Sequence, residues 1–216
     1  LGLINAGDTQ AALEDVLEVG QVYQTANSRG LQWAAVTAIA EAPKRRATVD
    51  SVVGAILDTC GTFGQRFLQA AGVVPERERA LERTAGCSDF RQLRVTFDDI
   101  YSGQGNPYAF SYANEVVTKA VCIFRMVQGD LRDAIVAGVN LGRDTDCITA
   151  VAAGIAGALD GKCSLPAEWV TQVDAATRAN RYTNSQRTLR ESADGLYHAF
   201  KTRLQRMRVY ANQMDY

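Results

Sequence analysis

The segment NLGRDTDCITAVAAGIAGALDG, residues 140–161, places a short polar stretch in front of an almost entirely apolar run. Asp144 and Asp146 flank Thr145 where helical spacing begins, and small or aliphatic residues fill most positions up to Leu159. A helix that is apolar nearly all round is typical of the interior of a helical protein, and small residues let neighbouring helices approach closely. We therefore predict a central helix over 146–159 whose acidic end lies at the floor of a site or is itself buried.

Helical spacing of apolar residues continues through most of the rest of the chain. It predicts helices over residues 8–20, 30–42, 48–63, 112–129, 130–140, 164–179 and 184–213. The charged middle, 75–107, is expected to be irregular and to end in a glycine-rich loop. Because alternating strand patterns are nearly absent, we predict an all-α helical bundle.

The bulk composition indicates one ordinary globular domain over residues 1–216. A net charge of −1 and the lack of a long apolar segment favour neither a membrane nor a nucleic-acid partner. Five scattered cysteines without a CxxC pair, and a single histidine, argue against a disulfide framework or a zinc site. This cysteine usage favours a reducing, cytoplasmic location, and any bound metal is expected to be a hard cation held by oxygen.

The acidic pair at the head of the apolar helix has two interpretations. One short polar side chain is enough to cap a helix, so Asp144 and Asp146 are compatible with a well-capped buried helix. Two carboxylates two residues apart around a turn can also point to a common centre, where a divalent ion would offset their repulsion. Spacing alone leaves both interpretations open.

The motif in its context resembles the second metal motif of the ADP-ribosylglycohydrolase family, which includes the dinitrogenase reductase-activating glycohydrolases. The resemblance rests on GRDTDC, on the Ala/Gly-rich helix ending in AGALDG, and on the downstream SLPAEW. The upstream VVTKAVCIFRMVQGDLRDAIVAGVNLG and LGLINAGDTQAAL also resemble family segments, so the similarity covers about residues 1–175. It implies a compact orthogonal multi-helix bundle, of which this chain is the carboxy-terminal portion.

The resemblance also implies an activity and its cofactor. Members hydrolyse the glycosidic bond between ADP-ribose and an acceptor, which makes an ADP-ribosylated protein or an ADP-ribose-containing small molecule the expected partner. Two Mg²⁺ (or Mn²⁺) ions are expected in the full-length protein. Asp144 and Asp146 would be metal ligands, and Cys147 stands where the family usually supplies a Thr or Ser hydroxyl. A neutral thiol is a poor ligand for hard Mg²⁺, so a water or a backbone carbonyl is expected to replace it.

The expected substrate-binding residues lie close to this motif. Gly142, Arg143 and Thr145 belong to the motif itself, and Arg143, in place of the commoner Gly, would donate to the pyrophosphate. Tyr108 and Tyr112 lie beside the glycine-rich loop, where they would stack on adenine or pack in the core.

One family feature is missing from these residues. The amino-terminal T-D-D stretch, which supplies the other metal half-site, and the early G-D-A-x-G segment do not occur. We therefore expect Leu1 to be an internal point of a longer protein, and the catalytic acid or base stays unassigned. Asp98 and Asp99 of TFDDIY are interpreted as a solvated turn rather than as a substitute half-site.

Two other functions compete with the hydrolase. A catalytically inactive ADP-ribose-binding or scaffold domain of the same fold would agree with Cys147 and with the missing half-site. A basic helical interaction module would use the eight Lys and Arg residues within 178–208, which we interpret instead as a solvated helix face. His198 lies on or beside the apolar stripe of the last predicted helix and is interpreted as structural.

Overall fold

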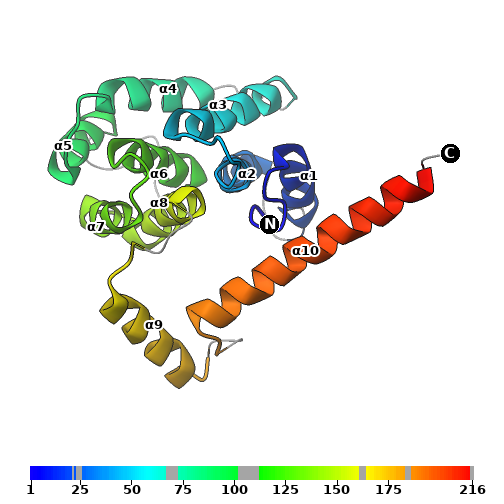
Figure 1. The fold of residues 1–216 in the computed structure, drawn as a ribbon. Coiled ribbons are helices and arrows are strands. Elements are labelled where there is room, and N and C mark those ends of the chain that lie inside the picture. Colours follow the sequence, from blue (N-terminus) through cyan, green and yellow to red (C-terminus); the bar gives the residue numbers. More distant parts are fainter. Residues whose placement is uncertain are drawn as a thin grey trace.

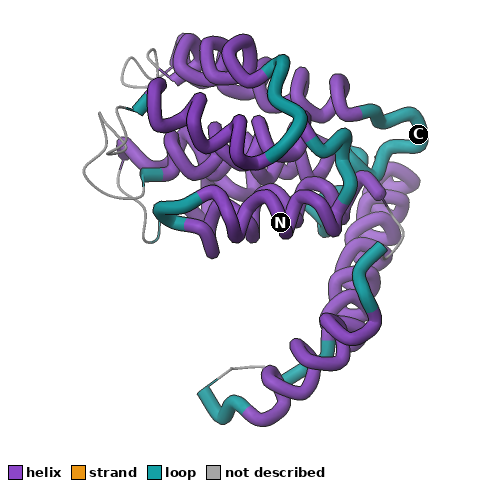
Figure 2. The backbone as a smooth tube through the Cα atoms, turned by 90° about the vertical axis from the view of Figure 1, so that its left-hand side faces the viewer, coloured by secondary structure: helices purple, strands orange, loops and turns teal. Residues whose placement is uncertain are grey.

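The computed structural model describes residues 1–20, 22, 26–66, 73–101, 112–160, 164–182 and 186–214, without the side chains of 26–33, 60–66 and 73–75. Within these ranges the regular elements are ten helices and no strand (Figures 1 and 2). They are α1 (Thr9–Gly20), α2 (Ala26–Glu41), α3 (Val49–Arg66), α4 (Val73–Thr84), α5 (Phe90–Ile100), α6 (Ala113–Met126), α7 (Leu131–Leu141), α8 (Thr145–Asp160), α9 (Ala167–Ala179) and α10 (Leu189–Met214). The predicted all-α fold is confirmed.

The helices α1–α8 pack into one bundle around α6 (Figure 1). Ten consecutive residues of α6, from Glu115 to Phe124, are buried, and the helix contacts α2, α3, α4, α7 and α8. The predicted apolar helix is α8, but it buries one face only, through Ile148, Ala152, Ile155 and Ala156. The side chains on the other face of α8 are small, so their partial exposure costs little hydrophobic free energy. The centre of the bundle is therefore α6 and not α8.

Helices α7 and α8 form the closest pair in the bundle. A Cβ atom added at Gly138 of α7 would lie 2.4 Å from Oγ1 and 2.9 Å from Cα of Thr149 in α8. Glycine is thus required at this crossing because any larger residue would push the two helices apart. The crossing matters for function because the turn between these two helices carries the acidic motif.

The charged middle of the chain is helical, contrary to the prediction of an irregular segment. Asp89 caps α5 by accepting hydrogen bonds from the backbone amides of Arg91 and Gln92. Asp98 and Asp99 lie in the last turn of α5, where both are exposed, so the prediction of a turn was wrong and that of solvation correct. The glycine-rich part of the predicted loop lies outside the described residues.

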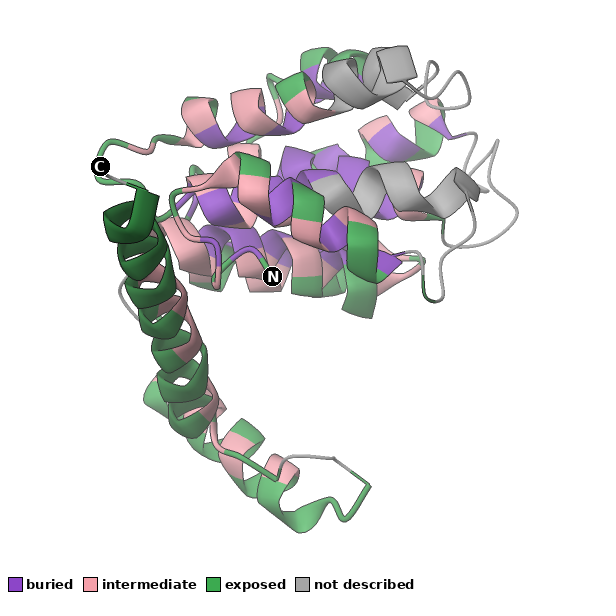
Figure 3. Cartoon of the chain, turned by 90° about the vertical axis from the view of Figure 1, so that its right-hand side faces the viewer, coloured by how far each residue is buried: buried purple, intermediate pink, exposed green. Residues whose placement is uncertain are grey.

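Helices α9 and α10 extend away from the bundle (Figures 1 and 3). Neither helix has a buried residue, and an ion pair between Arg203 Nη1 and Asp15 Oδ2, 3.6 Å apart, links α10 to α1. The apolar residues that share one stripe of the last helix are largely exposed, with Leu196 at 38% and Met207 at 48%. The compact part of the fold is therefore α1–α8. None of the described helices has the length and apolarity that a membrane crossing requires.

Candidate metal centre

A tight turn joins α7 to α8 and positions the acidic motif. Gly142 caps α7 with φ of 97°, and Arg143 follows with φ of 59°, so both residues adopt the left-handed region. Asp144 then immediately precedes α8, and its carbonyl accepts a 3.0 Å hydrogen bond from the amide of Ile148. Two successive residues of positive φ reverse the chain sharply and bring the three residues after Arg143 to the amino end of α8.

The motif forms a cluster of three potential metal donors. Carboxylate oxygens of Asp144 and Asp146 and the Sγ atom of Cys147 all lie within 4.8 Å of one another. Asp144 is half-buried, whereas Asp146 and Cys147 are exposed. The amino end of a helix carries partial positive charge, which favours carboxylates at this place. The structure thus brings together the two predicted carboxylate ligands and Cys147, which stands at the third ligand position of the family motif.

The protonation of the cluster follows from its hydrogen bonds. The neighbouring Asp144 carboxyl, together with the backbone amides of Asp146 and Cys147, lowers the pKa of Asp146. Partial desolvation, followed by the two neighbouring carboxylates, raises the pKa of the Cys147 thiol. At neutral pH, Asp146 is therefore ionised and Cys147 is protonated.

This donor set fits a hard divalent cation. Mg²⁺ is commonly held in proteins by one or two carboxylates and keeps several of its waters, which a partly exposed cluster allows. Asp144 and Asp146 supply such carboxylates at one point. The protonated thiol of Cys147 is the weakest of the three donors, because hard cations prefer oxygen.

A buried carboxylate of α6 forms an ion pair with Arg143 of the same turn. Glu115, whose side chain is 2% exposed, accepts from Arg143 at two points, with Nε 2.7 Å from Oε1 and Nη2 3.0 Å from Oε2. Lys119 Nζ also lies 2.6 Å from Oε1 of Glu115, and its ammonium lies 5.6 Å from the ring centroid of Phe97 and 5.3 Å from that of Tyr101. The Glu115 carboxylate thus has two cationic partners, one from the turn and one from its own helix, and the second of these lies beside aromatic rings at the end of α5.

Sequence reasoning missed Glu115 and Lys119. The signal that could have found them is a Glu and a Lys at i and i+4 within the apolar run of α6, since charged side chains are almost never fully buried unless paired. Which third residue joins them cannot be read from that spacing.

The family model for ADP-ribosylglycohydrolase matches residues 1–205. This chain belongs to the ADP-ribosylglycohydrolase family. The match extends beyond residue 175, where the motif resemblance ends, and it includes most of α10. Comparison with curated proteins finds no significant match, and neither does comparison with solved structures. The predicted family is confirmed, and at the level of the family the chain is an ADP-ribosylglycohydrolase-type hydrolase.

The remaining residues considered in the sequence analysis of this ADP-ribosylglycohydrolase lie both inside the acidic motif and far from it in the chain. Thr145 is half-buried in the first turn of α8. Tyr112 is the N-cap residue of α6 and is 45% exposed, while Tyr108 lies outside the described residues. His198 is exposed on α10, with Nδ1 2.7 Å from the backbone oxygen of Asp194.

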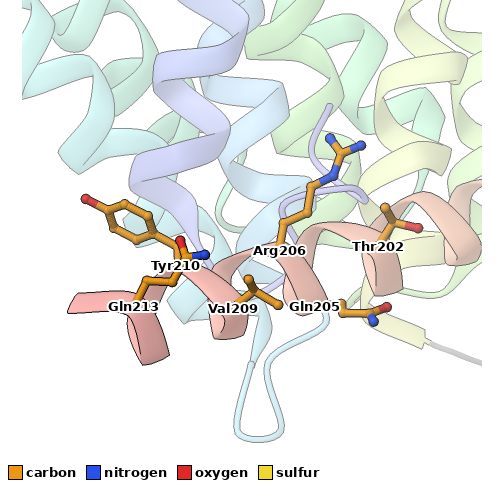
Figure 4. Close-up of a pocket in the computed structure, with 6 residues that line it drawn as sticks. All are labelled: Thr202, Gln205, Arg206, Val209, Tyr210 and Gln213. Carbon is orange, nitrogen blue, oxygen red and sulfur yellow. The ribbon is translucent and has the colours of Figure 1, made fainter. Parts of the chain in front are cut away.

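A surface hollow of this family member lies elsewhere, on α10 (Figure 4). It is lined by Thr202, Gln205, Arg206, Val209, Tyr210 and Gln213. These six residues include none of the predicted ligands and no carboxylate. The hollow therefore offers no acidic donor to a cation, and the turn before α8 remains the candidate metal centre.

Proposed function

We propose that this protein is a metal-dependent hydrolase that cleaves the glycosidic bond between ADP-ribose and a modified acceptor. The observation that carries the proposal is the cluster of Asp144, Asp146 and Cys147 donors within 4.8 Å, in a chain of the ADP-ribosylglycohydrolase family. A capped helix without a metal needs one polar side chain, whereas this turn brings two carboxylates to one point. The proposed cation is Mg²⁺ or Mn²⁺.

The side chains of the turn have distinct tasks in this proposal. Asp144 and Asp146 hold the cation, and Cys147 lies beside it without replacing an oxygen ligand. A bound divalent cation supplies positive charge that attracts ribose hydroxyls and polarises a water. Hydrolysis joins the oxygen of a water molecule to the anomeric carbon, breaks the bond to the acceptor, and transfers a proton to the acceptor. The group that moves this proton stays unassigned.

The substrate side of the proposal uses the neighbours of the ligands. We assign Arg143 to the pyrophosphate in addition to its ion pair with Glu115, since a guanidinium carries five N–H donors and donates well to phosphate oxygens. Gly142 and Thr145 border the ligands in sequence, and the exposed Tyr112 offers a ring for adenine. The partner is an ADP-ribosylated protein or an ADP-ribose-containing small molecule, without a membrane or nucleic acid.

Location and metal number complete the proposal. Cys87, Cys122 and Cys147 are free thiols, which agrees with a reducing cytoplasm. In the described ranges the cluster at α8 is the one group of three such donors, so the second ion expected in the full-length protein needs further ligands.

A second candidate function has a specific observation in its favour. Cys147 replaces a hydroxyl ligand with a thiol whose raised pKa keeps it protonated, which weakens the donor set. A catalytically inactive ADP-ribose-binding or scaffold domain would tolerate this change. The two functions differ in turnover, not in fold.

The test compares Asp146→Asn with Asp133→Asn in the full-length protein. Both residues are acidic and lie in the first turn of a helix, α8 and α7 respectively, so Asp133 is a matched control. Asn keeps the shape of Asp but removes the charged ligand. We expect Asp146→Asn to weaken Mg²⁺ or Mn²⁺ binding by at least the roughly 10–100-fold that loss of an outer-shell partner costs, and to abolish ADP-ribose release. Asp133→Asn should change neither.

Three results separate the functions. Metal-dependent release of ADP-ribose that Asp146→Asn abolishes supports the hydrolase. ADP-ribose binding without release, under conditions where a known member of the family is active, supports the inactive binder. Wild-type protein that binds neither metal nor ADP-ribose in calorimetric titration contradicts both.

A further inference from the structure

The turn between α7 and α8 contains a residue whose backbone conformation needs an explanation. Arg143 has φ of 59°, in the left-handed region that residues with a Cβ atom rarely adopt. Gly142 before it also has positive φ, but glycine adopts such angles without steric cost. The turn therefore requires a contact that holds Arg143 in place.

The side chain of Arg143 makes that contact in a rigid setting. Its guanidinium binds both carboxylate oxygens of Glu115, at 2.7 Å and 3.0 Å. Glu115 lies in the most buried segment of α6 and is itself held by Lys119 at 2.6 Å. Two parallel bonds between planar groups fix orientation as well as distance, unlike a single point contact.

We propose that Glu115 is a positioning residue for the metal-binding turn. Through Arg143 it holds the backbone in the conformation that places Asp144 and Asp146 together at the start of α8. This inference rests on the proposed function, because it gives the turn a metal to bind. We assign Glu115 no ligand role, because its carboxylate is paired with Arg143 and Lys119.

A simpler electrostatic effect must be separated from positioning. Removal of the Glu115 charge leaves Arg143 and Lys119 as uncompensated cations, which would repel a metal ion through space. The repulsion from Lys119 persists when residue 143 has no side chain, whereas positioning requires the Arg143 guanidinium. A double-mutant cycle between Glu115→Gln and Arg143→Gly distinguishes the two, because positioning makes their effects non-additive.

The first measurement is Mg²⁺ affinity, by calorimetric titration of the full-length protein without substrate. We expect Glu115→Gln to weaken binding roughly tenfold, as loss of an outer-shell partner does. In the Arg143→Gly background the same change should weaken binding less than about twofold. Lys119→Met is the matched control: it breaks the other ion pair of Glu115 and is expected to reduce stability while changing Mg²⁺ affinity less than about twofold.

The second measurement is hydrogen exchange of the metal-free protein. Glu115→Gln and Arg143→Gly should both speed exchange of the amides of residues 145–148 several-fold, with Lys119→Met and the amides of α1 unchanged. Arg143→Ala should speed it more than Arg143→Gly, since alanine disfavours positive φ. If Glu115→Gln does not fold, these two Arg143 variants still test whether the contact between Arg143 and Glu115 holds the turn.

Additive effects in the cycle, or wild-type exchange at 145–148 in both Arg143 variants, would overturn the positioning proposal. Absence of Mg²⁺ binding by the wild type would instead contradict the proposed function. The exchange experiment contains no metal, so it still decides whether Glu115 holds the turn.

Discussion

The crossing of α7 and α8 gives the sharpest test of how packing supports the turn that contains the candidate metal ligands. We consider Gly138→Ala, which adds one methyl group where the two helices are closest. The new Cβ would lie 2.4 Å from Oγ1 and 2.9 Å from Cα of Thr149. Rotation of the Thr149 side chain can relieve the first contact but not the second, which involves the backbone. The two helices must therefore separate slightly.

The magnitude follows from two opposing terms. Overpacking of a well-packed core costs about 1–3 kcal/mol, and a backbone clash belongs in the upper half of that range. Alanine in place of glycine within a helix returns about 1 kcal/mol of helix propensity. We therefore expect Gly138→Ala to lower the free energy of unfolding by about 1–2 kcal/mol. For a chain of this size the melting temperature should fall by roughly 3–6 °C.

Gly54→Ala is the control, because it changes the same residue type without a clash. Gly54 lies within α3, and a Cβ atom there would meet nothing within 4 Å. The propensity gain then stands alone, so the free energy of unfolding should rise by about 0.5–1 kcal/mol. Urea unfolding followed by circular dichroism measures both variants against the wild type.

The two glycine variants should thus have opposite signs. The reasoning is refuted if Gly138→Ala is as stable as the wild type or more stable, because the helices would then have room for a methyl group. Metal titration adds a second criterion: separation of α7 from α8 should also weaken Mg²⁺ binding by the turn, whereas Gly54→Ala should leave it unchanged.

Two further predictions concern cysteines. Cys147→Thr should tighten Mg²⁺ binding in titration, because a hydroxyl is a better ligand for a hard cation than a thiol; equal or weaker affinity would show that residue 147 does not face the ion. Burial raises the pKa of Cys122 to about 12, so above pH 9 the unfolded chain loses a proton that the folded chain keeps. The free energy of unfolding of the wild type, relative to Cys122→Ala, should then fall by about 1.4 kcal/mol per pH unit between pH 9 and 12. Urea titrations at pH 8, 9 and 10 check this, and a pH-independent difference would contradict it.

Local sequence was a good guide where one strong signal marked each end of a helix. The predicted range 146–159 differs from α8, Thr145–Asp160, by one residue at each end. The acidic residues at its start and the glycine after its end explain this agreement, since helix termini depend on nearby residues. Asp144 and Asp146 were predicted to lie close together, and they do, because both lie within one turn of the chain.

Local sequence failed where the apolar signal was sparse. Helix α5 buries only Leu93 and Phe97, and charged or polar residues occupy most of its other positions. Two buried residues one turn apart are too few to distinguish a helix from an irregular segment. On α10 the apolar spacing predicted the helix, but it does not show what the helix packs against: the stripe lies largely in solvent because most of that helix lies outside the bundle.

The sequence by itself determined the all-α class, the family and the closeness of Asp144 to Asp146, since each depends on residues close together in the chain. Only the tertiary structure decided which helix is central and which buried side chain pairs with Arg143 in the turn before α8. Glu115 and Arg143 are 28 residues apart, and they meet because α6 packs against α7 and α8. Periodicity shows which face of a helix is apolar, but it contains no information on which distant side chain lies opposite a buried charge.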